Sequence, residues 1–271
     1  MADSDPYYLG YRRAEQERLQ RQAEELAHEA RWLLDQIDVP VGARAIELGC
    51  GPRGCLDLLS ERVGPTGSVV GIERSDEAVA LARRFVTERG LRNVEIVAGD
   101  ARATALARGT FDLATARLVL VNVPRPEEIV AEMVALVRPG GIVALHEADW
   151  RQHVCDPPLP AWDRIFDLHV RYARMNGIDL FVGTKVPRML AEAGLVDVQA
   201  NPLIHVYPLG HPRRMIFYDF AENLRDRLLQ QALIDGDELT ELTAALKRHL
   251  DDPRTFVVSH LFLQAWGRKP S

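Results

Sequence analysis

Short apolar runs alternate along the chain with segments in which apolar residues recur every third or fourth position. The runs are rich in β-branched residues and cover residues 43–48, 68–73, 94–100, 111–117 and 141–149. Between them, helical periodicity covers residues 55–63, 76–90 and 127–137. Apolar strands that alternate with helices are typical of a parallel sheet covered on both faces. The pattern predicts a doubly wound α/β fold.

The two flanks of this core follow different patterns. Residues 12–38 have helical spacing throughout, which predicts one long amphipathic helix. Residues 196–204 and 256–267 predict two further strands, which would complete a seven-stranded, mostly parallel sheet with a terminal hairpin. We therefore expect an N-terminal helical cap, a cofactor-binding domain and a helical lid insertion of two helices joined at DGD. Their boundaries are 1–40 for the cap, 41–204 with 255–271 for the domain, and 205–254 for the lid.

Composition narrows the classes of partner. The 271 residues are 47% hydrophobic and 27% charged, and the formal net charge of −6 disfavours a nucleic-acid partner. The first residues lack the apolar core of a signal peptide, and no apolar run is long enough to span a membrane. The three cysteines match neither a disulfide framework nor a common zinc spacing. We expect a cytoplasmic protein with no metal and no membrane partner.

Residues 47–54, which read ELGCGPRG, contain a glycine cluster. Gly49, Gly51 and Gly54 form the spacing G-x-G-x-x-G. In dinucleotide-binding folds such glycines let the backbone approach a diphosphate, and a later acid binds a ribose. Glu73, which ends the second predicted strand, lies 22 residues after Gly51. These two features favour an NAD(P)-dependent oxidoreductase.

Two further acids do not fit that interpretation. Glu47 lies two residues before the first glycine, where a carboxylate would repel a diphosphate and attract an ammonium group. Gly99 and Asp100 end the third predicted strand, where a dehydrogenase requires no acid. The glycine spacing alone therefore does not decide the cofactor.

Five motifs occur in order along the predicted sheet. They are ELGCG at 47–51, GIE at 71–73, GDA at 99–101, FDLATARLVL at 111–120 and LVRPGG at 136–141. With them the chain resembles a class I S-adenosylmethionine-dependent methyltransferase over residues 41–150, with weaker similarity to residue 267. The resemblance implies a Rossmann-like methyltransferase fold, S-adenosylmethionine as cofactor and a small-molecule methyl acceptor.

The resemblance also implies roles for the motif residues. Glu47 would bind the methionine ammonium, directly or through water, with backbone groups of Gly49, Cys50 and Gly51 alongside, and Glu73 would accept both ribose hydroxyls. The remaining expected cofactor contacts are Gly99, Asp100 and Ala101 at the adenine amino edge, Arg74 and Leu118 over the two adenine faces, and Arg117 and Leu118 along the methyl channel. Arg53 departs from the family pattern, which has a glycine there, and this puts the path of the loop in doubt.

A base is needed mainly when the acceptor is a hydroxyl or a carbon acid. His146, Glu147 and Asp149 lie at the end of the fifth predicted strand, and His153 follows in the next loop. Since successive strand residues face opposite sides, either His146 or the pair of acids would reach the pocket. These four residues are the candidate catalytic residues.

Aromatic residues in the flanking segments suit a lid over an apolar or aromatic ligand, or a core between lid and sheet. They are Tyr7, Tyr8, Tyr11, Trp150, Trp162, Phe166, Tyr172, Phe181, Phe217, Tyr218 and Phe220. We expect the N-terminal helix and the lid to close over the cofactor and a metabolite, for example one of secondary metabolism. A non-catalytic binding protein on the same fold is the alternative outside catalysis. A homo-oligomer is compatible with the sequence.

Overall fold

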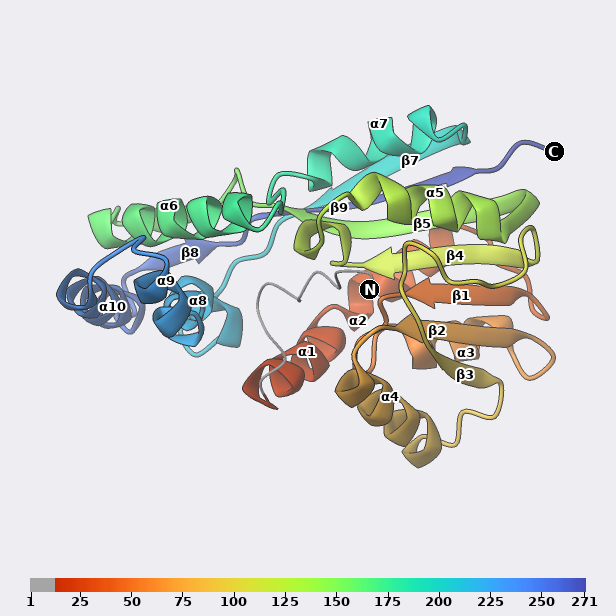
Figure 1. The fold of residues 1–271 in the computed structure, drawn as a ribbon, viewed down its shortest axis with the longest axis horizontal. Helices are drawn as coiled ribbons and strands as arrows, with labels where there is room; N and C mark the ends of the chain where they lie inside the picture. Colours follow the sequence, from red (N-terminus) through yellow and green to blue (C-terminus); the bar gives the residue numbers. More distant parts are fainter. Residues whose placement is uncertain (1–12) are drawn as a thin grey trace.

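The computed structural model describes residues 13–271, and its centre is a seven-stranded sheet in the order β3-β2-β1-β4-β5-β9-β7 (Figure 1). The strands are β1 (Arg44–Leu48), β2 (Ser68–Glu73), β3 (Val94–Ala98), β4 (Phe111–Arg117), β5 (Val137–Asp149), β7 (Val196–Leu203) and β9 (Leu261–Arg268). The first five are parallel, and β9 runs antiparallel to both β5 and β7. The predicted seven-stranded, mostly parallel sheet is confirmed.

Helices cover both faces of this sheet. On one face lie α2 (Ala27–Gln36), α3 (Leu56–Val63) and α4 (Asp76–Glu88), and on the other lie α5 (Pro126–Leu136) and α7 (Val186–Glu192). Neighbouring strand residues serve opposite cores: Ala45 packs with α2 and α3, whereas Ile46 belongs to the core beneath α5. This two-sided burial explains why the strands are apolar at almost every position.

The predicted single helix over residues 12–38 is wrong. The chain forms α1 (Arg13–Glu25) and α2, separated at Leu26, whose φ of −95° and ψ of 12° interrupt the helix. The two halves bury their apolar sides against different surfaces. α2 packs on the sheet, and α1 lies between the sheet and a second group of helices (Figure 1).

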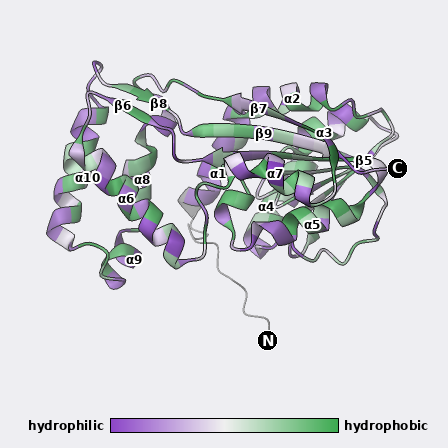
Figure 2. Ribbon diagram, turned by 90° about the horizontal axis from the view of Figure 1, so that it is seen from above, coloured by the Kyte–Doolittle hydropathy of each residue, from purple (hydrophilic) through white to green (hydrophobic). Residues whose placement is uncertain are grey.

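That second group, here called the helical subdomain, contains four helices and a small antiparallel sheet. They are α6 (Pro160–Met175), α8 (Ile216–Asn223), α9 (Arg225–Gln230), α10 (Gly236–Leu250), β6 (Val154–Asp156) and β8 (Phe256–Val258). In Figure 2 its helices carry hydrophobic and hydrophilic turns, whereas β9 is largely hydrophobic. None of the helices within residues 13–271 is both long and apolar enough to cross a membrane.

Two details of the predicted insertion differ from the structure. The predicted strand at 256–267 is two strands, because the chain leaves the main sheet before Leu261 and β8 pairs with β6 instead. The first predicted helix is interrupted at Leu224, which separates α8 from α9. α6 lies outside the predicted insertion of 205–254 but packs against α8 and α10.

Candidate functional site

A cavity of about 310 Å³ lies at the carboxyl ends of the central strands. Its wall combines the loop after β1, the ends of β2 and β4, α1 and part of the helical subdomain. The chain continues from β1 to β2 on one side, whereas β4 flanks β1 on the other. This reversal opens a crevice between adjacent crossovers, which is where open α/β sheets bind ligands.

The loop after β1 requires glycine at two positions for steric reasons. Gly49 and Gly54 have φ values of +67° and +55°. A Cβ on Gly49 would lie 2.8 Å from a methyl carbon of Val119, and a Cβ on Gly54 would lie 2.4 Å from Oε2 of Glu47. Arg53 takes no part in this close packing, because its guanidinium pairs with Asp57 and lies 5.0 Å from the Phe85 ring centroid. The departure from the family pattern therefore leaves the loop intact.

Glu47 lies fully buried beneath this loop. Both its carboxylate oxygens accept the N–H of Cys55, at 2.9 and 2.8 Å. Burial raises the pKa of Glu47 to about 7, and the nearby charge of Arg117 opposes this rise. Arg117 donates from Nη2 to the carbonyl of Gly54 at 2.9 Å, while its Nη1 is buried and has no hydrogen bond within the described part of the chain.

Glu73 is held by three backbone N–H groups. Oε1 accepts from Arg74 and Ser75, both at 2.8 Å, and Oε2 accepts from Gly51 at 3.0 Å. A carboxylate has about four acceptor positions. One position on Oε2 is therefore left for a ligand hydroxyl, in a side chain already oriented by the glycine loop.

Asp100 follows β3 and pairs with Arg102. Arg102 Nη2 lies 2.8 Å from Oδ2, Nε lies 3.1 Å from Oδ1, and the backbone N–H of Arg102 donates to Oδ1 at 2.9 Å. The hydrogen bonds from the Arg102 side chain keep the pKa of Asp100 below its ordinary value, so the acid is ionised and able to accept. Arg102 also lines the cavity, although it was not among the predicted cofactor residues. Its position directly after the GDA motif could have indicated this.

All of the predicted cofactor residues lie on the wall of this one cavity. They are Glu47, Gly49, Cys50, Gly51, Glu73, Arg74, Gly99, Asp100, Ala101, Arg117 and Leu118. They come from the ends of four strands, and the sheet order brings them together. Their individual roles stay predictions.

The structure corrects the expected position of the catalytic candidates, none of which lines the cavity. His146 is 2% exposed and packs edge-on against Phe262, and burial lowers its pKa to about 3. Glu147 accepts the N–H groups of three successive residues that begin at Val119 and end at Val121. Ala148 and Trp150 follow His146 on the same side of the chain and do line the cavity, so this side reaches the ligand space only beyond His146.

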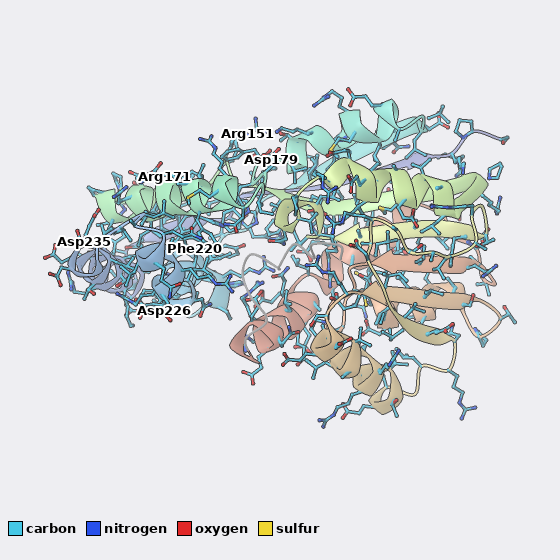
Figure 3. The ribbon with its side chains drawn as sticks, viewed as in Figure 1. Arg151, Arg171, Asp179, Phe220, Asp226 and Asp235 are labelled. Carbon is cyan, nitrogen blue, oxygen red and sulfur yellow. The ribbon has the colours of Figure 1, made fainter. Side chains whose placement is uncertain are left out.

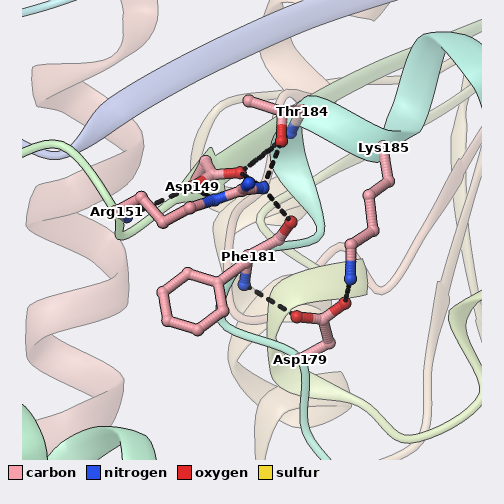
Figure 4. Close-up of polar contacts among 6 residues, drawn as sticks. All are labelled: Asp149, Arg151, Asp179, Phe181, Thr184 and Lys185. Atoms are coloured by element: carbon pink, nitrogen blue, oxygen red, sulfur yellow. Dashed lines mark hydrogen bonds and ion pairs between the residues drawn. The ribbon is translucent and has the colours of Figure 1, made fainter.

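Asp149 and His153 also have other partners. Asp149 is fully buried, pairs with Arg151 and accepts from the Thr184 hydroxyl at 2.7 Å, which ties the end of β5 to the turn before α7 (Figure 4). His153 contacts the carbonyl of Trp150 through Nδ1 at 3.0 Å and lies beside Phe166. The geometry supports structural roles for all four residues.

The far end of the cavity holds Trp150 and Phe220, which the sequence assigned to a lid or a core, and two histidines that are not among the candidate catalytic residues. Trp150 stacks on His260 with ring centroids 4.0 Å apart, and His169 contacts Phe220 at 4.1 Å. Phe220 lies where α8 faces α6 (Figure 3). Burial lowers the pKa of His169 to about 3 and that of His260 well below its ordinary value, so both imidazoles are neutral. In the sequence, the helical spacing that places His169 among the apolar residues of α6 could have indicated that it is buried.

α1 belongs to the N-terminal helix that we expect to close over the cofactor, although none of its residues was predicted to line the cavity wall. Glu15 and Gln16 are 7% and 3% exposed and line the cavity. The predicted aromatic residues Tyr7, Tyr8 and Tyr11 lie outside the described residues.

A seven-stranded sheet of this order, with a reversed β9 and acids at the carboxyl ends of β1, β2 and β3 around a glycine loop, defines the class I S-adenosylmethionine-dependent methyltransferases. The chain belongs to the family whose model is described as a methyltransferase domain and matches residues 41–194. The predicted fold class, family and cofactor are confirmed.

Two curated relatives illustrate the similarity. A 37.1 kDa protein of transposon TN4556 from Streptomyces fradiae is 34% identical over 65% of this chain and 50% of its own length. A demethylmenaquinone methyltransferase from Listeria monocytogenes is 30% identical over 49% of this chain and 54% of its own length. The chain thus spans about half the length of these relatives.

Solved structures share the fold at low identity. The YcgJ protein from Bacillus subtilis has a TM-score of 0.57 at 15% identity, over 90% of this chain and 99% of its own. A Haemonchus contortus phosphoethanolamine N-methyltransferase, solved with S-adenosylhomocysteine, has a TM-score of 0.55 at 15% identity, over 86% of this chain and 50% of its own. At these identities the likeness establishes the fold alone.

The residues of the cavity fit S-adenosylmethionine. Its amino acid end carries an ammonium, which needs a hydrogen-bond acceptor, and a carboxylate, which needs a donor; the carboxyl of Glu47 and the buried Nη1 of Arg117 supply these. Its ribose and adenine need separate hydrogen-bond acceptors, which Glu73 and Asp100 supply. Three acids around one loop suit this ligand better than a diphosphate.

Proposed function

We propose that this protein transfers the methyl group of S-adenosylmethionine to O, N or C of a small, apolar or aromatic acceptor. The observation that carries the proposal is the continuity of one cavity from Glu73 and Asp100 to the aromatic wall at Trp150 and Phe220. A cofactor at the glycine loop and an acceptor at the aromatic wall would share the same space. Seven of the similar curated proteins are named demethylmenaquinone methyltransferase, which is consistent with such an acceptor.

When bound, S-adenosylmethionine supplies a methyl group already activated on a sulfonium, so the protein contributes mainly by holding the acceptor in line. Leu118 lies on the wall between the two ends and has a φ of +53°, a strained value for a non-glycine residue. The N–H of Leu118 donates to the carbonyl of His146, and the carboxyl of Glu147 holds the next three N–H groups. We assign Glu147 a positioning role for this wall.

Water exclusion is the second contribution. α1 and α8 both line the cavity. Arg213, which precedes α8, forms an ion pair with Glu25 of α1 at 2.6 Å. We propose that residues 1–40 act as a cap and residues 205–254, together with α6, as a lid. Closure of the two would shield the reacting atoms from water.

Calorimetric titration with S-adenosylhomocysteine tests the cofactor part of the proposal. Glu73→Ala and Asp100→Ala should each weaken binding by roughly 1–3 kcal/mol, because each removes an acceptor for a ligand hydrogen bond. Asp112→Ala is the matched control, since Asp112 also pairs with an arginine, Arg138 at 2.6 Å, but lies outside the cavity. Wild-type affinity in both site variants, or tight binding of NAD without binding of S-adenosylhomocysteine, would contradict the proposal.

A further inference from the structure

The acceptor end of the cavity is lined by a cluster of aromatic and imidazole rings. Trp150 and His260 stack at an interplanar angle of 27°, the rings of His169 and Phe220 make a tilted contact, and Trp150 meets His169 edge-on. All four residues are at most 9% exposed and line the cavity. Flat, desolvated surfaces of this kind favour a planar ring as ligand.

Arg213 brings a polar group to the same wall. Its side chain is only 10% exposed, its Nε donates to Glu25 at 2.6 Å, and its guanidinium carbon lies 5.4 Å from the Phe262 ring centroid. Its Nη2 is buried and has no hydrogen-bond partner among residues 13–271. A buried guanidinium N–H without an acceptor is costly, so a ligand oxygen at this position would be stabilising.

The charged and titratable groups around Arg213 come from several elements. Glu25 of α1 pairs with it, and the charge of Arg213 adds to the burial that lowers the pKa of His146 in β5. Tyr207 and His211, which stack on each other, lie on its own segment, and the side chain of Arg213 opposes the rise in pKa that burial gives the Tyr207 hydroxyl. His205 follows β7 and lies near Glu29 of α2.

His260 lies on the β9 side of the same wall. Burial is the main cause of the lowered pKa of His260. The charge of Arg213 lowers this pKa further, and His153, His169 and His205 add to the same effect. His260 is therefore a poor base near neutral pH. An acceptor that loses a proton at this wall would therefore depend on stabilisation of the acceptor anion and not on His260 as a base.

We propose that Arg213 binds the ionised hydroxyl of an aromatic acceptor whose ring packs against this ring cluster on the cavity wall. This inference rests on the proposed function. A guanidinium beside a phenolic hydroxyl stabilises the anion and lowers the pKa of the phenol. On binding, the O–H bond breaks, the electron pair stays on oxygen and the proton passes to water, so no protein base is required. The resulting oxyanion makes the ring nucleophilic toward a methyl group.

The absorbance of 4-nitrophenol, which changes on ionisation, tests this inference directly. In the complex with S-adenosylhomocysteine, the bound probe should ionise at least about one pH unit below the free probe. Arg213→Gln should abolish that shift and weaken binding at neutral pH by roughly tenfold. Binding of 4-nitroaniline, which has no hydroxyl, should be the same in both proteins.

Two variants separate binding from a structural effect. Glu25→Gln breaks the same ion pair but leaves the guanidinium of Arg213, so the shift should persist. Arg164→Gln removes another paired arginine of the helical subdomain, outside the cavity, and should also leave it unchanged. The inference is wrong if 4-nitrophenol does not bind, if its pKa is unshifted in the wild type, or if Glu25→Gln abolishes the shift as Arg213→Gln does.

Calorimetry with S-adenosylhomocysteine distinguishes this inference from the proposed function. Arg164→Gln, which lies outside the cavity, should bind it with wild-type affinity. Failure of the wild type to bind it would overturn the proposed function. Normal cofactor binding, combined with phenol ionisation that does not depend on Arg213, would overturn only the inference.

Discussion

Three buried acids at the strand ends accept hydrogen bonds from the backbone that follows or faces them. Glu47 binds the N–H of Cys55, Glu147 binds three N–H groups after β4, and Asp149 binds the N–H groups of Arg151 and Thr184. Each acid is 0–1% exposed. The main role of these three carboxyl groups is therefore to hold the backbone of the loops in place. Among them, only Glu47 also lines the cavity.

Glu147→Gln should flatten the dependence of stability on pH. Burial raises the pKa of Glu147 from its ordinary 4.5 to about 7 in the folded state. The folded chain then holds the proton more tightly than the unfolded chain, so stability falls as pH rises from about 4.5 to about 7 and is level beyond it. The fall due to this residue is roughly 3 kcal/mol.

Urea unfolding at several pH values measures this effect. The difference between wild type and Glu147→Gln isolates Glu147 from Glu47, whose pKa is raised in the same direction. Glu88→Gln, which alters an exposed ion pair with Arg84, should keep the wild-type pH dependence. Parallel curves for wild type and Glu147→Gln would contradict the assignment.

At the scale of elements, one buried arginine joins the parts of the helical subdomain. Arg214 is 3% exposed and donates to four backbone carbonyls, those of Tyr207, Leu250, Asp252 and Thr255. These carbonyls belong to the segment before α8, the end of α10 and the turn before β8. A guanidinium has enough donors in a fixed fork to reach all four.

Arg214→Ala should therefore destabilise the protein by roughly 3–5 kcal/mol, because four buried carbonyls lose a charged donor. Arg214→Lys should recover only part of this loss, since an ammonium lacks the fork. Urea unfolding checks both values. Arg254→Ala is the control, because Arg254 is 86% exposed and should matter little. Equal stability of the two alanine variants would show that the Arg214 network is dispensable.

At the scale of the whole molecule, the cavity exists only where α1, the sheet and the helical subdomain meet. Arg21 of α1, Asp100 after β3 and Leu224 after α8 line the same space although they are far apart in sequence. Figure 1 shows α1 between the sheet and the helical subdomain. A ligand in the cavity should therefore hold all three parts together.

S-adenosylhomocysteine should slow tryptic cleavage within α1, at Arg18 or Arg21, because both residues line the cavity. If cleavage requires α1 to detach from the bound state, a ligand at ten times its Kd should slow it by roughly tenfold. Mass spectrometry of timed digests measures the rates. Cleavage at the exposed Arg254 is the internal control and should be unaffected. Equal rates at α1 with and without ligand would contradict closure.

The sequence by itself determined the sheet, its covering helices and the family, because apolar alternation and glycine requirements are local properties of the chain. It also placed Glu73 and Asp100 correctly at the cavity, since the ends of neighbouring parallel strands must meet at one edge. Only the tertiary structure decided which other polar residues face the ligand. Glu147 accepts hydrogen bonds from the backbone after β4, and Arg213 lines the cavity. In both cases the neighbouring residues come from distant segments of the chain, so no local sequence pattern predicts the contact.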